Sequence, residues 1–232
     1  MKKTAHIALP ALAVACSFAS GAQAAVVVAG WSMATAIPAA TTGTSYNYGA
    51  ADSGDLASGT MLSSGHAAAA TTYSSPTGNG STYSFSSNNW TIGDYYQVSV
   101  STIGYSGVSI SWDQTRSGTG PATFDAVMSV DGGANWTTIL AGYSVIQAGL
   151  AGTNTTSWSS VTPQAAFTLT AVASAAANGQ ANVLFRLRST VTTAAAGTNR
   201  VDNIVVSGTA IPAPGALALL GVAGLIGARR RR

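Results

Sequence analysis

Apolar and polar positions alternate one by one along four segments in the second half of the chain. These segments cover residues 95–101, 108–112, 124–130 and 183–188. Successive side chains of an extended strand point to opposite faces, so a period of two predicts half-buried β-strands. Stretches rich in Gly, Ser, Thr and Asn separate the segments, as expected for polar turns.

No segment between these strands has the 3.6-residue apolar period of an amphipathic helix, so a parallel sheet built from βαβ units is not expected. The chain is also poor in charged residues, at 7%, and rich in Ser, Thr and aromatic residues, which suits strands better than helices. We therefore predict an all-β fold, a jelly-roll-like antiparallel β-sandwich. Residues 25–89 are less regular and are expected to form long loops or an edge region.

The N-terminus has the layout of a secretory signal peptide. A basic start, Lys2-Lys3, precedes an apolar stretch over residues 7–18, and Ala22-Gln23-Ala24 forms a small-x-small cleavage signal. These features predict a signal helix within residues 1–24 and a cut after its last alanine. A lipoprotein signal with Cys16 as the lipidated residue is the alternative.

The C-terminus carries a second targeting pattern. Pro212-Ala213-Pro214 precedes a short apolar run over residues 215–228, and the chain ends in Arg229, Arg230, Arg231 and Arg232. The run predicts a hydrophobic helix that is shorter than the ~20 residues of a full membrane span. The arginines are expected to hold the chain end on the cytoplasmic side. The chain then divides into a signal peptide (1–24), a β-sandwich domain (25–210) and a sorting or anchor segment (211–232).

This last segment resembles the PEP-CTERM sorting tail of Gram-negative bacteria, although Ala213 stands where that family has glutamate. The resemblance implies an exosortase-like membrane protease as a partner. It also implies transient residence in the inner membrane, followed by release to the cell surface or the extracellular space. A plain C-terminal membrane anchor is the alternative. Residues 95–208 further resemble the jelly-roll domains that often accompany such tails, through the segments 116–121, 131–133, 185–187 and 199–206.

Removal of both signals changes the charge of the chain. Six of the ten basic residues leave with them, and the four remaining arginines face seven aspartates, which gives a net charge near −3. This balance argues against a basic surface for nucleic acid. Cys16 is the only cysteine and leaves with the signal peptide, so no disulfide or thiol chemistry is expected in the exported part.

One local motif predicts a hairpin. Residues 129–136 read Ser-Val-Asp-Gly-Gly-Ala-Asn-Trp and match the Asp-box pattern Ser-x-Asp-x-Gly-x-x-Trp. Glycine supplies the positive φ of the turn and Asp131 bonds to turn amides, so the expected role of the motif is structural.

The sequence offers no evident catalytic constellation. His66 is the only histidine of the exported part, so zinc sites of the usual kind are not expected, and no Gly-x-Ser-x-Gly elbow accompanies it. No spacing among the seven aspartates singles out a pair for glycoside hydrolysis. We predict a protein that is not an enzyme and that has no cofactor. A structural calcium ion is a candidate, and ordinary turn capping by the aspartates is the alternative. The candidate calcium ligands are Asp52, Asp55 and Asp202.

Two tryptophans are candidates for sugar stacking, because Trp90 and Trp158 lie in polar loop sequence. The main hypothesis is an exported protein of the cell surface or extracellular matrix, structural or adhesive, in the exopolysaccharide or biofilm setting that the tail resemblance implies. The alternative is a carbohydrate-binding module, with a polysaccharide as its partner. A hydrolase with an unrecognised acidic site is the third hypothesis.

Overall fold

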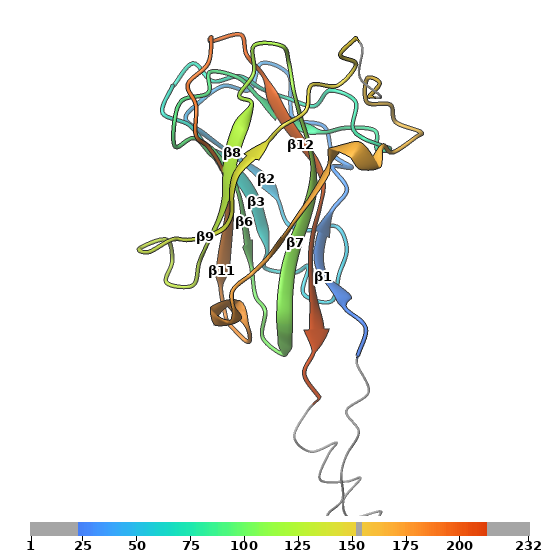
Figure 1. Ribbon diagram of the computed structural model, residues 1–232, viewed down its shortest axis with the longest axis vertical. Coiled ribbons are helices and arrows are strands. Elements are labelled where there is room, and N and C mark those ends of the chain that lie inside the picture. The colour runs from blue at the N-terminus through green and yellow to red at the C-terminus, as the bar shows by residue number, and fades with distance from the viewer. Residues whose placement is uncertain (1–22, 152–154, 213–232) are drawn as a thin grey trace, which may run out of the picture.

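The computed structural model describes residues 23–151 and 155–212 (Figure 1). Both predicted terminal helices, Ala213, Pro214 and the four C-terminal arginines lie outside the described residues. Within the described ranges, no helix is long and apolar enough to span a membrane.

The described residues form two sheets in which every pair of neighbouring strands is antiparallel. Sheet 1 has the order β10 (Thr168–Val172), β7 (Tyr105–Arg116), β12 (Asn199–Ala210), β5 (Phe85–Ser87) and β4 (Tyr73–Ser74), and β1 (Val26–Trp31) also pairs with β12. Sheet 2 has the order β2 (Ser45–Gly49), β3 (Met61–Gly65), β6 (Tyr95–Val100), β11 (Val183–Ser189), β8 (Thr123–Ser129) and β9 (Thr137–Ser144). Two 3₁₀ helices, η1 (Ala165–Phe167) and η2 (Ala175–Ala177), lie on either side of β10 in the sequence.

The sheets pack face to face around an apolar core, as the period of two predicts. In β6, Tyr96, Val98 and Val100 are buried in that core, whereas Gln97 and Ser99 between them are half-exposed. The same alternation holds in β7, β8 and β11. The predicted strands and the all-β antiparallel sandwich are therefore confirmed.

The first third of the domain is more regular than its sequence pattern indicated. Residues 25–89 supply five strands, of which β1, β4 and β5 join sheet 1 and β2 and β3 join sheet 2. These strands are two to six residues long, too short for repeated alternation to be recognised. The expectation of long loops is thus corrected, because pairing with distant strands fixes these segments. The alternative of an edge region agrees with β2 and β4, which are edge strands of their sheets.

β12 connects the two ends of the sandwich. Its first residues pair with β5 and its later ones with β1, where Val26 lies opposite Gly208. The two ends of the described chain therefore leave the domain side by side, at the bottom of Figure 1. A strand advances ~3.3 Å per residue, so the start of this 12-residue strand lies more than 30 Å from the exit of the tail.

Candidate functional site

Three side chains stack on the outer face of sheet 2. The guanidinium carbon of Arg186 lies 3.7 Å from the ring centroid of Tyr95 and 4.2 Å from that of Trp136. Arg186 Nε also donates a hydrogen bond of 2.7 Å to Gln97 Oε1. We refer to Tyr95, Gln97, Trp136 and Arg186 as the platform.

Strand alternation brings the platform together. Tyr95 and Gln97 occupy the polar side of β6, and Arg186 occupies the polar side of β11. The antiparallel register places Arg186 directly opposite Gln97. Sequence reasoning missed this site, although the period of two in both strands already placed these residues on the solvent side of the sheet.

A glycine makes room for the tyrosine ring. Gly65 in β3 pairs with Tyr95 across the strands, and a Cβ atom at this glycine would lie only 2.5 Å from the ring carbon Cζ of Tyr95. Any larger residue would push the ring away. The absence of a side chain in β3 therefore lets Tyr95 lie over the sheet.

The predicted Asp-box hairpin is present and positions Trp136. Asp131 accepts hydrogen bonds from the Ser129 hydroxyl at 2.7 Å, from the Asn135 backbone at 3.0 Å and from the Asn135 side chain at 2.7 Å. These bonds, those of the Asn135 backbone first, hold the pKa of Asp131 well below its usual range. Trp136 Nε1 donates to the Gly133 carbonyl at 2.9 Å. The turn thus fixes the indole beside Arg186, on the outer face of the sheet.

Arg186 keeps its positive charge at the centre of the platform. Burial between the two rings lowers its pKa, but an arginine side chain stays protonated in proteins. The ion pairs within the described residues join His66 to Asp94 and Arg188 to Asp125, so Arg186 has no carboxylate partner there. Two aromatic rings, one cation and one amide are therefore held rigidly on an open sheet face.

A cavity of about 450 Å³ adjoins the platform at Tyr95. Its lining includes Ser45, Gly65, His66, Gly93 and Asp94. Aromatic rings that stack on apolar faces, together with convergent hydrogen-bonding groups, are the combination found in small-ligand sites. The platform and this cavity form a continuous candidate binding surface.

His66 and Asp94 form a buried pair beside this cavity. His66 Nδ1 lies 3.2 Å from Asp94 Oδ2, and Asp94 also accepts bonds from the backbone of Ala67 and Thr91. Burial of Asp94 opposes its ionisation, but these hydrogen bonds outweigh it and lower its pKa. His66 Nε2 is buried with no hydrogen-bond partner in the described residues, so no serine hydroxyl among them completes a Ser-His-Asp arrangement.

Trp90 does not lie on a surface, contrary to the sugar-stacking prediction. Its side chain is fully buried, and its ring packs against His66, Tyr96 and Phe124 with centroid distances of 4.5, 5.1 and 5.4 Å. Its Nε1 donates to the Ser87 carbonyl at 2.9 Å. Part of the polar stretch before Trp90 is the buried strand β5, and no face of the ring is open to a sugar.

Trp158 is also buried, with 5% of its surface exposed. Phe167 packs edge-on against its ring, with the centroids 5.6 Å apart, and the Arg200 guanidinium lies 4.9 Å from the ring centroid. Its burial corrects the prediction of a direct stacking surface. Trp158 instead supports an arginine on the outer side of sheet 1.

The three predicted calcium ligands bind protein donors. Asp52 accepts from the Ser32 backbone and hydroxyl, Asp55 accepts from the Tyr105 hydroxyl, and Asp202 accepts from Asn79, Ser81 and Asn203. Within the described ranges no group of three or more His, Cys, Asp or Glu residues is arranged to hold a metal ion. The structure therefore does not bring Asp52, Asp55 and Asp202 together as one calcium site.

No protein-family model matches the chain, and no curated protein matches it. Among solved structures, the chain is similar to the CBM22-1 xylan-binding domain from Paenibacillus barcinonensis Xyn10C, with 15% identity over 83% of this chain and 100% of that one and a TM-score of 0.43. It is also similar to the K1 cleaved adhesin domain of Lys-gingipain from Porphyromonas gingivalis W83, with 15% identity over 78% and 97% of the chains and a TM-score of 0.43. The N-terminal cellulose-binding domain from Cellulomonas fimi β-1,4-glucanase C is 15% identical over 56% and 80% of the chains, with a TM-score of 0.31. All three scores lie below 0.5, so the function has to be inferred from this chain's own side chains.

Proposed function

We propose that the protein is an exported, non-catalytic polysaccharide-binding protein of the cell surface, and that the platform on sheet 2 binds the sugar chain. The observation that carries this proposal is the stack of Tyr95, Arg186 and Trp136 on a solvent-facing sheet. Aromatic rings supply flat apolar area against the C–H faces of sugars, and guanidinium and amide groups bind the hydroxyls.

The rigidity of the platform favours binding. Gln97 and the two rings fix Arg186, and the Asp-box turn fixes Trp136. Because these side chains are already ordered, a ligand does not have to immobilise them, which removes a large part of the usual entropic cost of binding.

The carboxylates on this face are already bonded within the protein, which favours binding over hydrolysis. Asp125 on β8 lies 3.4 Å from Arg188 and accepts a 2.8 Å hydrogen bond from the Gly142 backbone. Asp131 is held by the turn that it caps. Glycoside hydrolysis ordinarily needs two carboxyl groups on either side of the bond that is cleaved.

The position of the two chain ends suits a protein that is tethered at one end. Both described ends leave the same end of the sandwich (Figure 1), which leaves the rest of its surface free of the chain ends. We propose that the PEP-CTERM-like segment sorts the protein through an exosortase-like protease after transient membrane residence, and that the domain then acts in adhesion or as matrix.

Isothermal titration calorimetry of the purified protein against a panel of soluble neutral polysaccharides tests the binding role. We expect Tyr95→Ala and Trp136→Ala each to weaken affinity about tenfold or more, as for aromatic anchors at binding surfaces. Tyr95→Phe keeps the ring and should bind nearly as well as the wild type. Absence of binding across the panel, or equal affinity in the alanine variants, would refute the proposal.

A further inference from the structure

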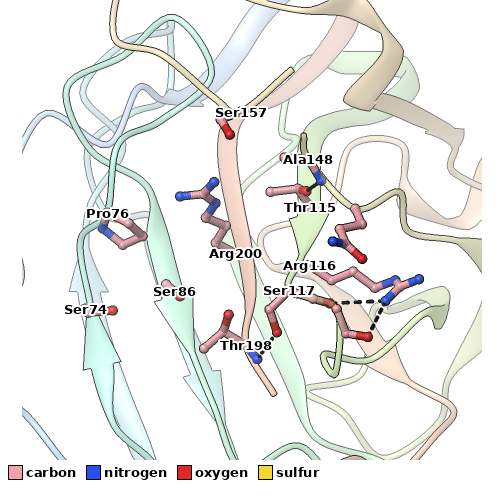
Figure 2. Close-up of a pocket in the computed structure, with 12 residues that line it drawn as sticks. Ser74, Pro76, Ser86, Thr115, Arg116, Ser117, Ala148, Ser157, Thr198 and Arg200 are labelled. Carbon is pink, nitrogen blue, oxygen red and sulfur yellow. Dashed lines mark hydrogen bonds between the residues drawn. The ribbon is translucent and has the colours of Figure 1, made fainter. Parts of the chain in front are cut away.

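A second cavity lies on the outer side of sheet 1, at the start of β12. It has a volume of about 530 Å³, and its lining includes Thr115, Arg116, Ser117, Gln147, Thr198 and Arg200. These residues belong to β7, to β12, to the positions directly next to these two strands and to the segment that follows β9, and Figure 2 labels most of them. The cavity is therefore on the opposite sheet from the platform, and its size is that of a small-ligand site.

Arg200 is held in this cavity by contacts with uncharged groups, and the nearby charge of Asp202 acts on its pKa without a direct ion pair. Its guanidinium lies over the buried ring of Trp158, and its Nη1 donates to the Thr77 carbonyl at 3.2 Å. Asp202 lies on the same side of β12, but its oxygens accept from Asn79, Ser81 and Asn203 rather than from the arginine.

Arg116 is held in the same way, by backbone carbonyls. Its Nε donates to Val145 at 3.1 Å, and its Nη1 donates to Ser117 at 3.1 Å and to Gly118 at 3.2 Å. Carbonyls orient the guanidinium but carry no formal charge. Neither Arg116 nor Arg200 forms an ion pair with any aspartate in the described part of the chain.

This arrangement is unusual for a chain with so few charges. The exported part has four arginines, and two of them line one cavity, half-buried and without a direct ion pair among the described residues. A cation that is partly removed from water costs free energy unless an anion compensates it. The natural compensating group is an anionic ligand, and a guanidinium matches the two oxygens of a carboxylate or a sulfate ester.

The lining also indicates the kind of molecule that carries the anion. Serine, threonine and glutamine side chains line the cavity beside the arginines, and the nearby Trp158 is buried, so hydrogen bonding prevails over ring stacking. Figure 2 shows the two guanidinium groups on opposite sides of the start of β12, with Thr198 and Ser117 between them. Two separate cationic points suit a polymer with repeated anionic groups better than a single small ion.

We propose that this cavity is a second binding site, which takes the carboxylate or sulfate groups of an acidic polysaccharide. The proposal rests on the proposed function in that both concern polysaccharides, but it involves different residues on the other sheet. The platform supplies affinity for sugar rings in general, and the cavity selects chains that carry negative charge.

The test measures affinity of the full chain, purified in a mild detergent, for three polymers. Polygalacturonate carries carboxylates, its carboxyl-reduced form is the matched neutral polymer, and dextran sulfate carries sulfate esters. We expect at least one acidic polymer to bind about tenfold more tightly than the neutral one, with a preference that declines as salt rises. The acidic polymer that is preferred identifies the anion.

Arg116→Gln and Arg200→Gln should each lower affinity for the acidic polymer about tenfold and leave affinity for the neutral polymer unchanged. Arg116→Lys and Arg200→Lys should lose less affinity than the glutamine variants, because lysine keeps the positive charge but lacks the paired N–H donors of the guanidinium. Arg188→Gln is the matched control, since it removes one positive charge on the other sheet. Thermal unfolding of each variant verifies that the fold is intact.

The outcomes separate the two proposals. Equal affinity for acidic and neutral polymers, or glutamine variants that keep the acidic preference, would overturn the cavity proposal and leave the platform intact. Acidic binding that persists in Tyr95→Ala would support the cavity as a separate site. Absence of binding to all three polymers would overturn the cavity proposal, whereas the platform is overturned only when the whole panel of neutral polysaccharides fails to bind.

Discussion

Asp202 should make the domain more stable as the pH falls from neutral towards 4. Burial raises the pKa of Asp202 to about 6 from the ordinary value of 3.8, with a smaller contribution from the neighbouring charge of Asp113. The two carboxylates lie opposite each other in β12 and β7. Asn79 bridges them, donating from its backbone to Asp202 at 2.6 Å and from its side-chain amide to Asp113 at 2.8 Å.

The sign of the effect follows from proton uptake. Between pH 6 and pH 3.8 the folded state holds a proton on Asp202 that the unfolded chain releases, so lowering the pH stabilises the folded state. The displacement of this pKa corresponds to about 3 kcal/mol, at 1.36 kcal/mol for each pH unit. Between pH 7.5 and pH 4, the contribution of Asp202 to the free energy of unfolding should therefore rise by about 2 to 3 kcal/mol.

Urea unfolding of the wild type and of Asp202→Asn, measured at pH steps from 7.5 to 4, isolates this contribution. Groups that titrate in both proteins cancel in the difference between the two free energies of unfolding. That difference should shift by about 2 to 3 kcal/mol in favour of the wild type as the pH falls. A difference that stays constant across this range would refute the assignment of the raised pKa to Asp202.

Three further predictions concern packing, the platform and the chain ends. Trp90→Ala should lower the free energy of unfolding by about 3 to 5 kcal/mol, as for other buried tryptophans, and leave polysaccharide affinity unchanged in the folded fraction; a loss of affinity without destabilisation would contradict its core position. Gly65→Ala should displace the Tyr95 ring, since the added Cβ would lie 2.5 Å from it, and should reduce affinity for neutral polysaccharide in titration calorimetry while the circular dichroism spectrum remains that of a β protein. Mass spectrometry of the exported protein should give a chain that begins at Ala25 and lacks the C-terminal arginines; recovery of intact Arg232 at the cell surface would favour a plain anchor.

Local alternation predicted those features that depend on neighbouring residues in the sequence. The strands β6, β7, β8 and β11 could be derived from it, because their side chains face a core on one side and solvent on the other. The Asp-box turn was predictable for the same reason, since all its bonds lie within residues 129–136.

Features that depend on contacts between distant residues were not predictable. Trp90 follows polar residues and was interpreted as a loop tryptophan, yet its burial depends on His66, Tyr96 and Phe124. The second cavity unites Arg116 with Arg200, which are 84 positions apart in the sequence and come together only because β7 pairs with β12.

The position of the second cavity relative to the chain ends bears on how a tethered domain would act. Arg200 lies near the start of β12, whereas the tail leaves from the end of the same strand. Arg116 lies at the corresponding end of the antiparallel strand β7, paired with Asn199. If residues 211–232 hold the protein at a membrane or cell surface, the cationic cavity lies more than 30 Å along the strand from the attached end, at ~3.3 Å for each residue.

A polymer can then reach the cavity without competing with the anchor, and a long chain can contact the cavity on sheet 1 and the platform on sheet 2 at the same time. Such divalent contact would raise the effective affinity well above that of either site alone. Long polysaccharides should therefore bind much more tightly than oligosaccharides that fill only one site.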